Sequence, residues 1–255
     1  MGTTADGALT VHRFPADPPD PSRSADLTRA LALGGGDTAA EDAWARAQGP
    51  VAPGMLAALG SARRRHEVIA LWTYLYATTQ LAMPIAPERT VLVPLAHDEP
   101  MFRLGLSRGL VRMAAGLAFM TPEERRLVGA LPGIGDEPEA IVGAGLHPAP
   151  PGDGSRVPAT RDLPERFALY LGRVDPAKGL EPLVRANGDY RAAGGALGLV
   201  LAGRPTVEMR LPEWVRTTGF VDDRTRSDLL DAAEVVVLPS PHESLSLVAL
   251  EAWRA

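Results

Sequence analysis

Residues 235–253 read VVVLPSPHESLSLVALEAW, a wholly apolar run followed by a proline-bounded turn and then a helix-like segment. A continuous apolar strand that leads directly into a helix is typical of a parallel sheet with helices on both faces. Short apolar, β-branched runs alternate with helix-like segments in the same way through both halves of the chain. The alternation predicts an α/β fold built on parallel sheets.

A stretch rich in proline and glycine, HPAPPGDGSRVPATRDLP at residues 147–164, interrupts this alternation. Such a composition is typical of a linker between compact units. We therefore expect an N-terminal domain at residues 1–150, a linker at 151–164 and a C-terminal domain at 165–255. The expected strands are Leu9–Phe14, Val68–Leu71, Thr90–Pro94, Gly116–Met120, Ala140–Gly143, Phe167–Leu171, Gly198–Ala202, Val215–Phe220 and Glu234–Pro239. The expected helices are Ser24–Leu33, Ala39–Gln48, Pro53–Arg64, Met101–Ala115, Pro122–Leu131, Gly179–Ala193, Asp223–Ala233 and Leu245–Ala255.

Composition excludes several functional classes. The chain has 255 residues and a formal net charge of -5, whereas a general nucleic-acid binder needs a basic surface, so no nucleic-acid partner is expected. It contains no cysteine, which excludes disulfide frameworks and thiolate zinc sites and fits a reducing, cytoplasmic setting. The uncharged segment Val68–Ala86 is long enough to cross a bilayer, but its threonines, Gln80 and Pro84 favour a buried strand followed by a short helix.

The segment Tyr170–Val184, YLGRVDPAKGLEPLV, places two cations after a buried strand. The strand ends in a turn at Gly172, and Arg173 and Lys178 follow before the next helix. Ligands of open α/β sheets bind at the carboxyl ends of strands, where helix N-termini present amides to anions. The pair therefore suits a diphosphate, although two solvated charges on a loop explain the same residues.

Two glutamates follow the apolar run at 235–238. Glu243 is expected in the loop before a helix, with the backbone amides of Ser244, Leu245 and Ser246 at the positive end of that helix, and Glu251 lies on the helix itself. A carboxylate also stabilises a helix N-terminus without any ligand, so the pattern leaves a purely structural role open for Glu243.

The two segments occur in the order found in family-4 glycosyltransferases, which this chain resembles over nearly all of residues 165–255. Members of that family carry G-R-(V/L)-x-x-x-K-G after the first strand of the C-terminal domain and later two glutamates separated by seven residues. The resemblance continues through LGLVLAGRP at 197–205 and GFVDD at 219–223. It implies the GT-B fold, with two Rossmann-like domains, and a retaining transfer of a hexose from a nucleotide-diphosphate sugar. No metal or other cofactor is implied.

The resemblance also implies roles for single residues. Gly172, Arg173 and Lys178 would contact the donor diphosphate, and the two cations would stabilise the charge that develops on the leaving nucleotide. Glu243 and the amides of Ser244, Leu245 and Ser246 would hold the transferred sugar and the phosphates. Glu251 would accept hydrogen bonds from the ribose hydroxyls.

In the N-terminal half, TVLVPLAHDEP at 90–100 ends an expected strand with His97, Asp98 and Glu99. Related enzymes often place a histidine at this strand end, which makes His97 a candidate catalytic residue, although a lone histidine after a strand is commonly structural. A metal site made of three adjacent residues is disfavoured, because their side chains point in different directions. The basic run at residues 63–65 fits either contact with an anionic membrane or acceptor, or a helix end in solvent.

Compared with the family pattern, the chain is expected to be shortened at both ends, with both domains incomplete. Two hypotheses for function follow. The first is a glycosyltransferase whose acceptor is a glycan, a lipid or a small molecule, with peripheral membrane contact as an open option. The second is an inactive remnant that binds nucleotide sugar weakly or serves as an interaction module. An NAD-linked oxidoreductase would need a glycine fingerprint, and the glycine pairs at 133–135 and 143–145 lack the third glycine.

Overall fold

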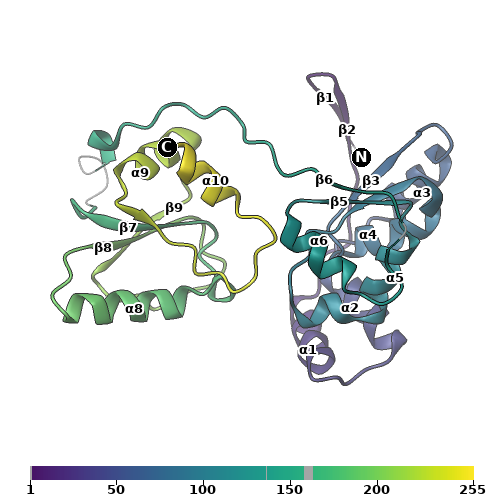
Figure 1. The fold of residues 1–255 in the computed structure, drawn as a ribbon, viewed down its shortest axis with the longest axis horizontal. Helices are drawn as coiled ribbons and strands as arrows, with labels where there is room; N and C mark the ends of the chain where they lie inside the picture. Colours follow the sequence, from purple (N-terminus) through teal and green to yellow (C-terminus); the bar gives the residue numbers. More distant parts are fainter. Residues whose placement is uncertain (1, 136, 158–162) are drawn as a thin grey trace. The chain divides into compact units, whose positions relative to one another are not determined.

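The structure, a computed structural model, describes residues 2–135, 137–157 and 163–255. The chain divides into two compact units, Met1–Gly143 (unit 1) and Ala144–Ala255 (unit 2), and each has its own sheet and core (Figure 1). The stretch expected as a linker at 151–164 falls within unit 2, and residues 158–162 lie outside the described part.

Unit 1 is built on a four-stranded parallel sheet in the order β3-β4-β5-β6. Its strands are β3 (Ile69–Trp72), β4 (Thr90–Val93), β5 (Gly116–Phe119) and β6 (Glu139–Ile141). Its helices are α1 (Pro21–Ala32), α2 (Thr38–Gln48), α3 (Pro53–Ala62), α4 (Ala77–Ala82), α5 (Gly105–Met113) and α6 (Pro122–Gly129). Short 3-10 turns lie at η1 (Met83–Ile85), η2 (Pro87–Arg89) and η3 (Pro100–Arg103). One core joins the sheet and helices, with the side chains of Trp44, Tyr74, Leu92, Phe102 and Phe119 fully buried.

The expected strand Leu9–Phe14 exists, but its expected place in a parallel sheet is wrong. It forms β2 (Leu9–Arg13), which pairs antiparallel with β1 (Gly2–Asp6) through a turn at Gly7. Both strands are exposed along nearly their whole length. In the strand LTVHR, Leu9 and Val11 are the only apolar residues, and Leu9 is 67% exposed, so the hairpin stays outside the core.

The expected helix Met101–Ala115 is also corrected by the structure. Leu104 has extended backbone angles, φ −64° and ψ 153°, and separates η3 from α5. Glu41 of α2 accepts hydrogen bonds from the amides of Gly105 and Leu106 and so satisfies the new N-terminus of α5. The break therefore depends on a side chain more than sixty residues away, which a local helical pattern does not reveal.

Unit 2 carries a second four-stranded parallel sheet in the order β10-β7-β8-β9. The strands are β7 (Phe167–Leu171), β8 (Gly198–Ala202), β9 (Val215–Gly219) and β10 (Val235–Val236). Helix α8 (Leu180–Ala192) lies on one face, and α9 (Asp223–Ala232) and α10 (Leu247–Arg254) lie on the other (Figure 1). Short turns lie at η4 (Gly154–Arg156) and η5 (Pro176–Lys178). Because β10 returns to the far side of β7, the direction of winding reverses between these two strands, and ligands of open α/β sheets bind at such a point.

A segment of the expected linker packs onto α9. The amide of Asp153 donates to Asp228 Oδ1 at 2.8 Å, and Arg156 Nη2 donates to the same oxygen at 2.9 Å. A Cβ atom at Gly152 would lie 2.4 Å from the carbonyl oxygen of Ser227, so the backbone touches the helix directly. Residues 152–157 are therefore part of the packing of unit 2.

Within the described residues, no helix combines the length and the apolar character that crossing a bilayer requires. The uncharged segment at 68–86 contains β3, α4 and η1, in line with the expected strand and short helix.

Candidate active site

Two glycines bring the loops after β7 and β8 together. Gly172 follows β7 with φ +152°, and its amide donates to the carbonyl of Ala202 at 2.9 Å. A Cβ atom at Gly203, which follows β8, would lie 1.7 Å from the carbonyl oxygen of Gly172. Only a residue without a side chain allows this approach, so the Gly-Arg pair at 172–173 is held at the carboxyl edge of the sheet.

A third glycine joins the loop after β7 to the loop after β10. Gly179 is the N-cap of α8 in the left-handed conformation, with φ +74°. A Cβ atom there would lie 2.2 Å from the carbonyl oxygen of Pro239. Lys178, which precedes Gly179, is thereby placed beside the segment that leads to Glu243.

Lys178 and Glu243 meet directly. Their Nζ and Oε1 atoms are 3.0 Å apart, and the two side chains are 30% and 37% exposed. An ion pair this accessible contributes about 0 to 1 kcal/mol to stability, so its strength does not oppose exchange of partners. The loop after β7 and the loop before α10, which were expected to share a ligand, are therefore in contact. They meet at the point where the winding of the sheet reverses.

Arg173 lies five residues before Lys178 in the chain and is exposed. Its carbonyl oxygen accepts a hydrogen bond from the hydroxyl of Tyr170 at 2.6 Å. Burial raises the pKa of Tyr170 to about 12, with Glu243 adding to the rise and Arg173 opposing it. The neutral hydroxyl of Tyr170 therefore lies within the field of both charged groups. Sequence reasoning missed Tyr170, whose only signal is a polar tip in the otherwise apolar strand FALYL.

The loop before α10 places the remaining expected residues. Glu243, Ser244 and Leu245 precede the helix, and Ser246 is its N-cap, with the Ser246 hydroxyl accepting from the amide of Ala249 at 3.3 Å. The expected start at Leu245 is therefore two residues early, because Ser246 has extended backbone angles. The N–H groups of the first helical turn begin at Leu247.

Glu251 lies on α10, and its side chain is 17% exposed. Its Oε1 atom is 3.5 Å from Nη1 of Arg226, which comes from α9. Glu243 and Glu251 are thus each paired with a cation from another element of unit 2, Lys178 and Arg226 respectively. Sequence reasoning did not single out Arg226, since its position on a polar helix resembles an ordinary exposed charge.

An apolar pocket of about 560 Å³ opens beside these loops in unit 2. Val174 and Gly203, which follow β7 and β8, and Gly219, the last residue of β9, line it together with Met209 and Leu211. The pocket is formed by the carboxyl ends of three strands, the edge at which α/β sheets bind ligands. The loop Arg204–Leu211 closes it, and beyond Pro205, where the LGLVLAGRP segment ends, this loop carries no motif that sequence reasoning recognised.

His97 belongs to unit 1 and follows β4. Its Nε2 atom is 3.3 Å from Oε1 of Glu99, and the hydroxyl of Tyr74 donates to the same oxygen. Tyr74 is buried, and this burial, followed by the hydrogen bond to Glu99, raises the pKa of Tyr74 far above its usual value. Asp98 instead pairs with Arg103, so the neighbouring carboxylates at 98 and 99 have separate partners.

A buried glutamate fixes the backbone of the loop that carries His97. Glu124, at the start of α6, is 2% exposed and accepts hydrogen bonds from the amides of Ala96 and Met120, both at 2.7 Å. Burial raises the pKa of Glu124, while the amides of Met120 and Ala96 act against that rise. The sequence TPEE at 121–124 predicts the helix start correctly but gives no sign that this carboxylate ties β5 to the loop after β4.

Comparison with known proteins gives the following similarities. Residues 165–255 match the family model described as glycosyl transferases group 1. The chain is 34% identical over 94 residues to an alpha-D-kanosaminyltransferase of Streptomyces kanamyceticus, covering 33% of this chain and 24% of that protein. It is 31% identical over 169 residues to a D-inositol 3-phosphate glycosyltransferase of Mycobacterium tuberculosis, covering 60% of this chain and 35% of that protein. The chain thus spans about a quarter to a third of the length of these relatives.

Solved structures share the fold. A trehalose-phosphate synthase from Burkholderia vietnamiensis matches with a TM-score of 0.60 at 13% identity, covering 98% of this chain and 69% of that one. A sucrose-phosphate synthase from Thermosynechococcus elongatus matches with a TM-score of 0.59 at 19% identity, covering 78% and 57%. These similarities confirm the predicted α/β class with Rossmann-like parallel sheets of the GT-B kind.

Proposed function

We propose that this chain, which resembles the group 1 glycosyltransferases over residues 165–255, transfers a hexose from a nucleotide-diphosphate sugar to an acceptor with retention of anomeric configuration. The observation that carries the proposal is the contact of Lys178, from the loop that also carries Arg173, with Glu243 where the winding of the unit 2 sheet reverses. A cationic and an acidic group side by side at that edge suit a ligand that has a diphosphate and a hydroxylated sugar.

Each group then has a chemical task. Arg173 and Lys178 bind the diphosphate and stabilise the negative charge that grows on it as the glycosidic bond breaks. Lys178 exchanges Glu243 for a phosphate oxygen, which leaves the Glu243 carboxylate to accept hydrogen bonds from sugar hydroxyls. Ser244, Leu245 and Ser246 present backbone groups to the donor, while Gly172 lets the chain approach it closely.

The nucleoside end of the donor has two partners in this proposal. Glu251 accepts hydrogen bonds from the ribose, and Arg226 holds its carboxylate in place. The apolar pocket beside Val174 and Met209 takes the base, because its volume of about 560 Å³ and apolar wall suit a flat ring. Unit 2 alone therefore offers places for all three parts of a nucleotide sugar.

For His97 we propose a part in the same reaction, supported by the resemblance and by its ordered setting. Its imidazole is held by Glu99, and the backbone before it is held by Glu124. A side chain fixed in this way needs little reorganisation to contact a sugar. We place the reaction in the cytoplasm, in keeping with a cysteine-free chain.

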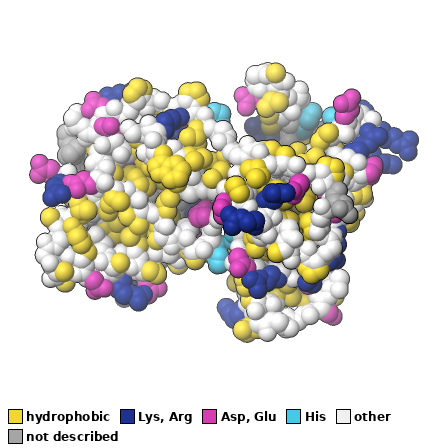
Figure 2. All heavy atoms as spheres, viewed as in Figure 1, with side chains coloured by type: hydrophobic (Ala, Val, Ile, Leu, Met, Phe, Trp, Pro, Cys, Tyr) yellow, Lys and Arg dark blue, Asp and Glu magenta, His cyan; other side chains and the backbone are white. Residues whose placement is uncertain are grey.

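The acceptor is proposed to be a hydroxylated small molecule. One relative supports this choice by name, the glycosyltransferase named for D-inositol 3-phosphate. A lipid acceptor remains the second option, with contact to an anionic membrane through Arg63, Arg64 and Arg65. These three residues are exposed at the end of α3, and Figure 2 shows dark-blue side chains gathered at that end of unit 1.

The test measures donor binding and turnover with the whole chain. UDP-, GDP- and ADP-glucose are titrated by calorimetry, and sugar transfer or hydrolysis is followed by NMR, which also reports the anomeric configuration of the product. Lys178→Ala is expected to weaken nucleotide binding by about 10- to 150-fold, since charge-assisted contacts to phosphate contribute about 1.5 to 3 kcal/mol. Arg185→Ala, an exposed cation on α8, is the matched control. An unchanged affinity in Lys178→Ala would overturn the assignment.

The alternative is a protein that binds nucleotide sugar without transferring it, or that serves as an interaction module. Exposed apolar side chains favour a binding partner for unit 2, with Trp253 at 83% and Leu247 at 50% exposed. Figure 2 shows hydrophobic side chains gathered around α10. Nucleotide binding without transfer or hydrolysis for every donor would favour this alternative.

A further inference from the structure

Two strained turns are joined at the carboxyl edge of the unit 1 sheet. Among the residues that the structure describes, Thr73 and Leu95 are the two non-glycine residues with positive φ, at +61° and +53°. Thr73 directly follows β3, and Leu95 follows β4 after Pro94. The amide of Thr73 donates to the carbonyl oxygen of Val93 at 2.8 Å. The next amide, that of Tyr74, donates to Pro94 at 3.0 Å, so the turns are hydrogen-bonded to each other. Positive φ is costly for bulky or β-branched side chains, so both turns are strained.

Leucine is a poor choice for the conformation that residue 95 adopts. A left-handed residue that follows a proline in a turn is normally glycine or asparagine, because these two tolerate positive φ. Here Pro94 is followed by Leu95, whose side chain is half-buried. A strained residue of this kind persists only where surrounding contacts hold it, and such residues are concentrated at functional sites.

The Glu124 carboxylate holds the turn at Leu95. Glu124 is 2% exposed, and its Oε1 atom accepts from the amide of Ala96 at 2.7 Å. Its Oε2 atom accepts from the amide of Met120 at 2.7 Å. Burial raises the pKa of this carboxyl, and hydrogen bonds from the amides of Met120, Ala96 and Leu95 oppose the rise. One buried side chain thus ties the strained turn to the end of β5.

A buried amide holds the neighbouring turn. Gln80 is 6% exposed, and its Nε2 atom donates to the carbonyl oxygen of Tyr74 at 2.6 Å. The Thr73 hydroxyl accepts from the amide of Leu75 at 3.4 Å. The two strained turns are therefore held in the same way. In each, a buried polar side chain bonds to the backbone of the residue that follows the left-handed one.

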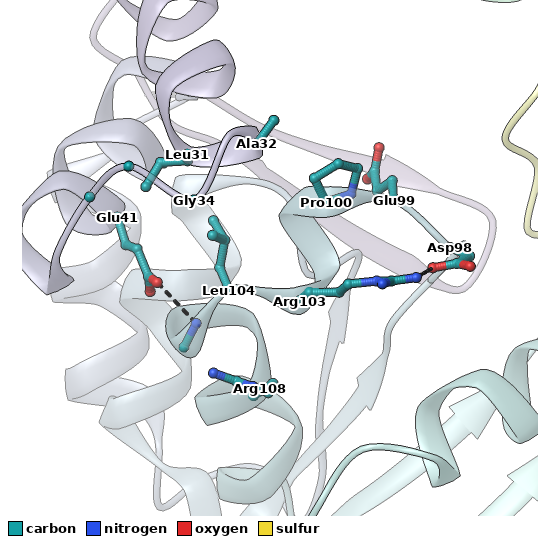
Figure 3. A pocket seen from close by; sticks show the side chains of 13 residues that line it. Leu31, Ala32, Gly34, Glu41, Asp98, Glu99, Pro100, Arg103, Leu104 and Arg108 are labelled. Carbon is teal, nitrogen blue, oxygen red and sulfur yellow. Dashed lines mark hydrogen bonds and ion pairs between the residues drawn. The ribbon is translucent and has the colours of Figure 1, made fainter.

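The two turns carry the side chains that surround His97. Tyr74 follows the first turn, and its hydroxyl donates to Glu99. His97 follows the second turn, and its Nε2 atom lies 3.3 Å from the same oxygen of Glu99. Glu99 also lines a pocket of about 550 Å³ in unit 1 (Figure 3). Figure 3 shows that the neighbouring Asp98 is instead directed at Arg103. The conformations of both turns therefore decide where the His97 imidazole lies.

We propose that Leu95 and Glu124 are positioning residues for His97, and that the strained turn serves to hold the imidazole in one orientation. Glycine at position 95 would relieve the strain but would also give the turn more accessible conformations. The imidazole would then occupy more than one orientation. The consequence for catalysis rests on the proposed function, in which His97 takes part in sugar transfer. The placement of the ring does not depend on that function.

The first experiment tests the strain. Leu95→Gly and Leu95→Ala remove nearly the same side chain, but only glycine relieves the left-handed angle. The folding equilibrium constant of Leu95→Gly, measured by urea unfolding, is expected to exceed that of Leu95→Ala by about fivefold. Ala114→Gly is the control and is expected to be less stable than wild type, because Ala114 has φ −66°. A Leu95→Gly variant no more stable than Leu95→Ala would show an unstrained turn and overturn the proposal.

The second experiment follows the His97 imidazole by NMR in the whole chain, with His97→Asn used to assign its signals. Wild type and Leu95→Asn, which tolerates the left-handed angle, are expected to give one sharp set. Leu95→Gly and Glu124→Gln are expected to give broadened or doubled signals, since glutamine replaces one of the two acceptor oxygens by a donor. Glu123→Gln, the exposed neighbour on α6, is the control and should match wild type.

Unchanged His97 signals in Leu95→Gly would overturn the proposal, and this variant decides the question if Glu124→Gln does not fold. Turnover separates the proposal from the proposed function. If wild type transfers sugar, kcat is expected to fall about tenfold or more in Leu95→Gly. The Kd for UDP should stay unchanged, and Leu95→Asn should restore kcat. Undiminished kcat with disturbed His97 signals would also overturn the proposal. No transfer by wild type would refute the proposed function alone, and the His97 signals would still decide the placement.

Discussion

At the scale of single residues, the proposed donor site is made of charged groups that are paired with one another in the structure. Lys178 contacts Glu243, Arg226 contacts Glu251, and Tyr170 lies in the field of Glu243 and Arg173. The two ion pairs keep the flexible cations oriented. Separating either pair costs little free energy, because the side chains in both pairs are partly exposed. On the proposed function, a diphosphate would therefore replace a weak partner of Lys178.

Glu243→Gln tests this exchange of partners. Removing the carboxylate frees Lys178 for phosphate, so the affinity for UDP, which carries no sugar, is expected to rise by up to about fivefold, the equivalent of about 1 kcal/mol. Sugar transfer is expected to fall, since the acceptor for sugar hydroxyls is weakened. Calorimetry and a transfer assay measure the two effects. Glu181→Gln, on exposed α8, is the control, and weaker UDP binding in Glu243→Gln would contradict the mechanism.

Gly179→Ala tests the contact between the two loops. The left-handed backbone angle costs about 1 kcal/mol for alanine, and the clash with the Pro239 carbonyl adds to it, so a loss of about 2 to 4 kcal/mol is expected. Gly194→Ala is the matched control, since Gly194 has φ +91° and open space around its Cβ position. Urea unfolding measures both. Equal losses in the two variants would show that the Pro239 contact is unimportant.

At the scale of elements, local patterns predicted most of the parallel strands and helices to within a few residues. β7 and β8 were predicted at their observed bounds, because FALYL and GLVLA are apolar on both faces and bounded by polar or glycine turns. Local patterns failed where a distant side chain determines where a helix begins. At Leu104 the expected helix is broken, and the Glu41 carboxylate caps the N-terminus of α5. They also predicted β2 in a parallel sheet, whereas it pairs antiparallel with β1. The alternation of residues along one strand does not show which strand it pairs with.

The site residues also divide into those that stand in local motifs and those whose roles depend on distant partners. The cations at 173 and 178 and the glutamates at 243 and 251 stand in motifs and were found from sequence. Tyr170, Arg226, Glu99 and Glu124 were not identified as functional, because their roles arise from partners on other elements. The two pockets are likewise invisible to a linear pattern, since each gathers residues from several loops.

The segment packed on α9 gives a prediction at this scale. A Cβ atom at Gly152 would press on the Ser227 carbonyl at 2.4 Å, so Gly152→Ala is expected to destabilise unit 2 by about 1 to 3 kcal/mol. Gly145→Ala, whose Cβ would meet nothing within 4 Å, is the control. Chemical unfolding followed by circular dichroism compares them. A loss no larger than that of the control would place the segment outside the cooperative fold.

Asp228 makes the same packing sensitive to acid. Burial acts to raise the pKa of Asp228, but hydrogen bonds from Arg156 and the Asp153 amide hold it below its ordinary value. A carboxyl with a lowered pKa in the folded state contributes stability above its ordinary pKa and loses that contribution as the pH falls through the folded value. Wild type is thus expected to lose more stability than Asp228→Asn between about pH 5 and pH 2, a range that includes the ordinary value of 3.8 and extends below it. Asp189→Asn, exposed on α8, should behave like wild type.

At the scale of the whole molecule, each unit has its own buried core, centred on residues such as Leu92 in unit 1 and Leu199 in unit 2. Either leucine changed to alanine leaves a cavity that costs about 2 to 5 kcal/mol. Leu199→Ala is expected to speed amide hydrogen exchange in β7–β9 while β3–β5 stay protected, and Leu92→Ala is expected to do the reverse. Mass spectrometry after exchange measures both. Loss of protection in both sheets from either change would show one cooperative unit.

The order of strands in unit 2 has a consequence for how a newly made chain matures. Lys178 and Glu243 are 65 residues apart in sequence, and they meet only once β10 has docked beside β7. Closing so long a loop is slow compared with forming local helices, so the cations exist for some time without their acidic neighbour. Ribosome-bound chains that end before β10 therefore carry Arg173 and Lys178 but lack Glu243 and Glu251. If the proposed function holds, binding of a complete sugar nucleotide would report that synthesis and folding of unit 2 have both finished.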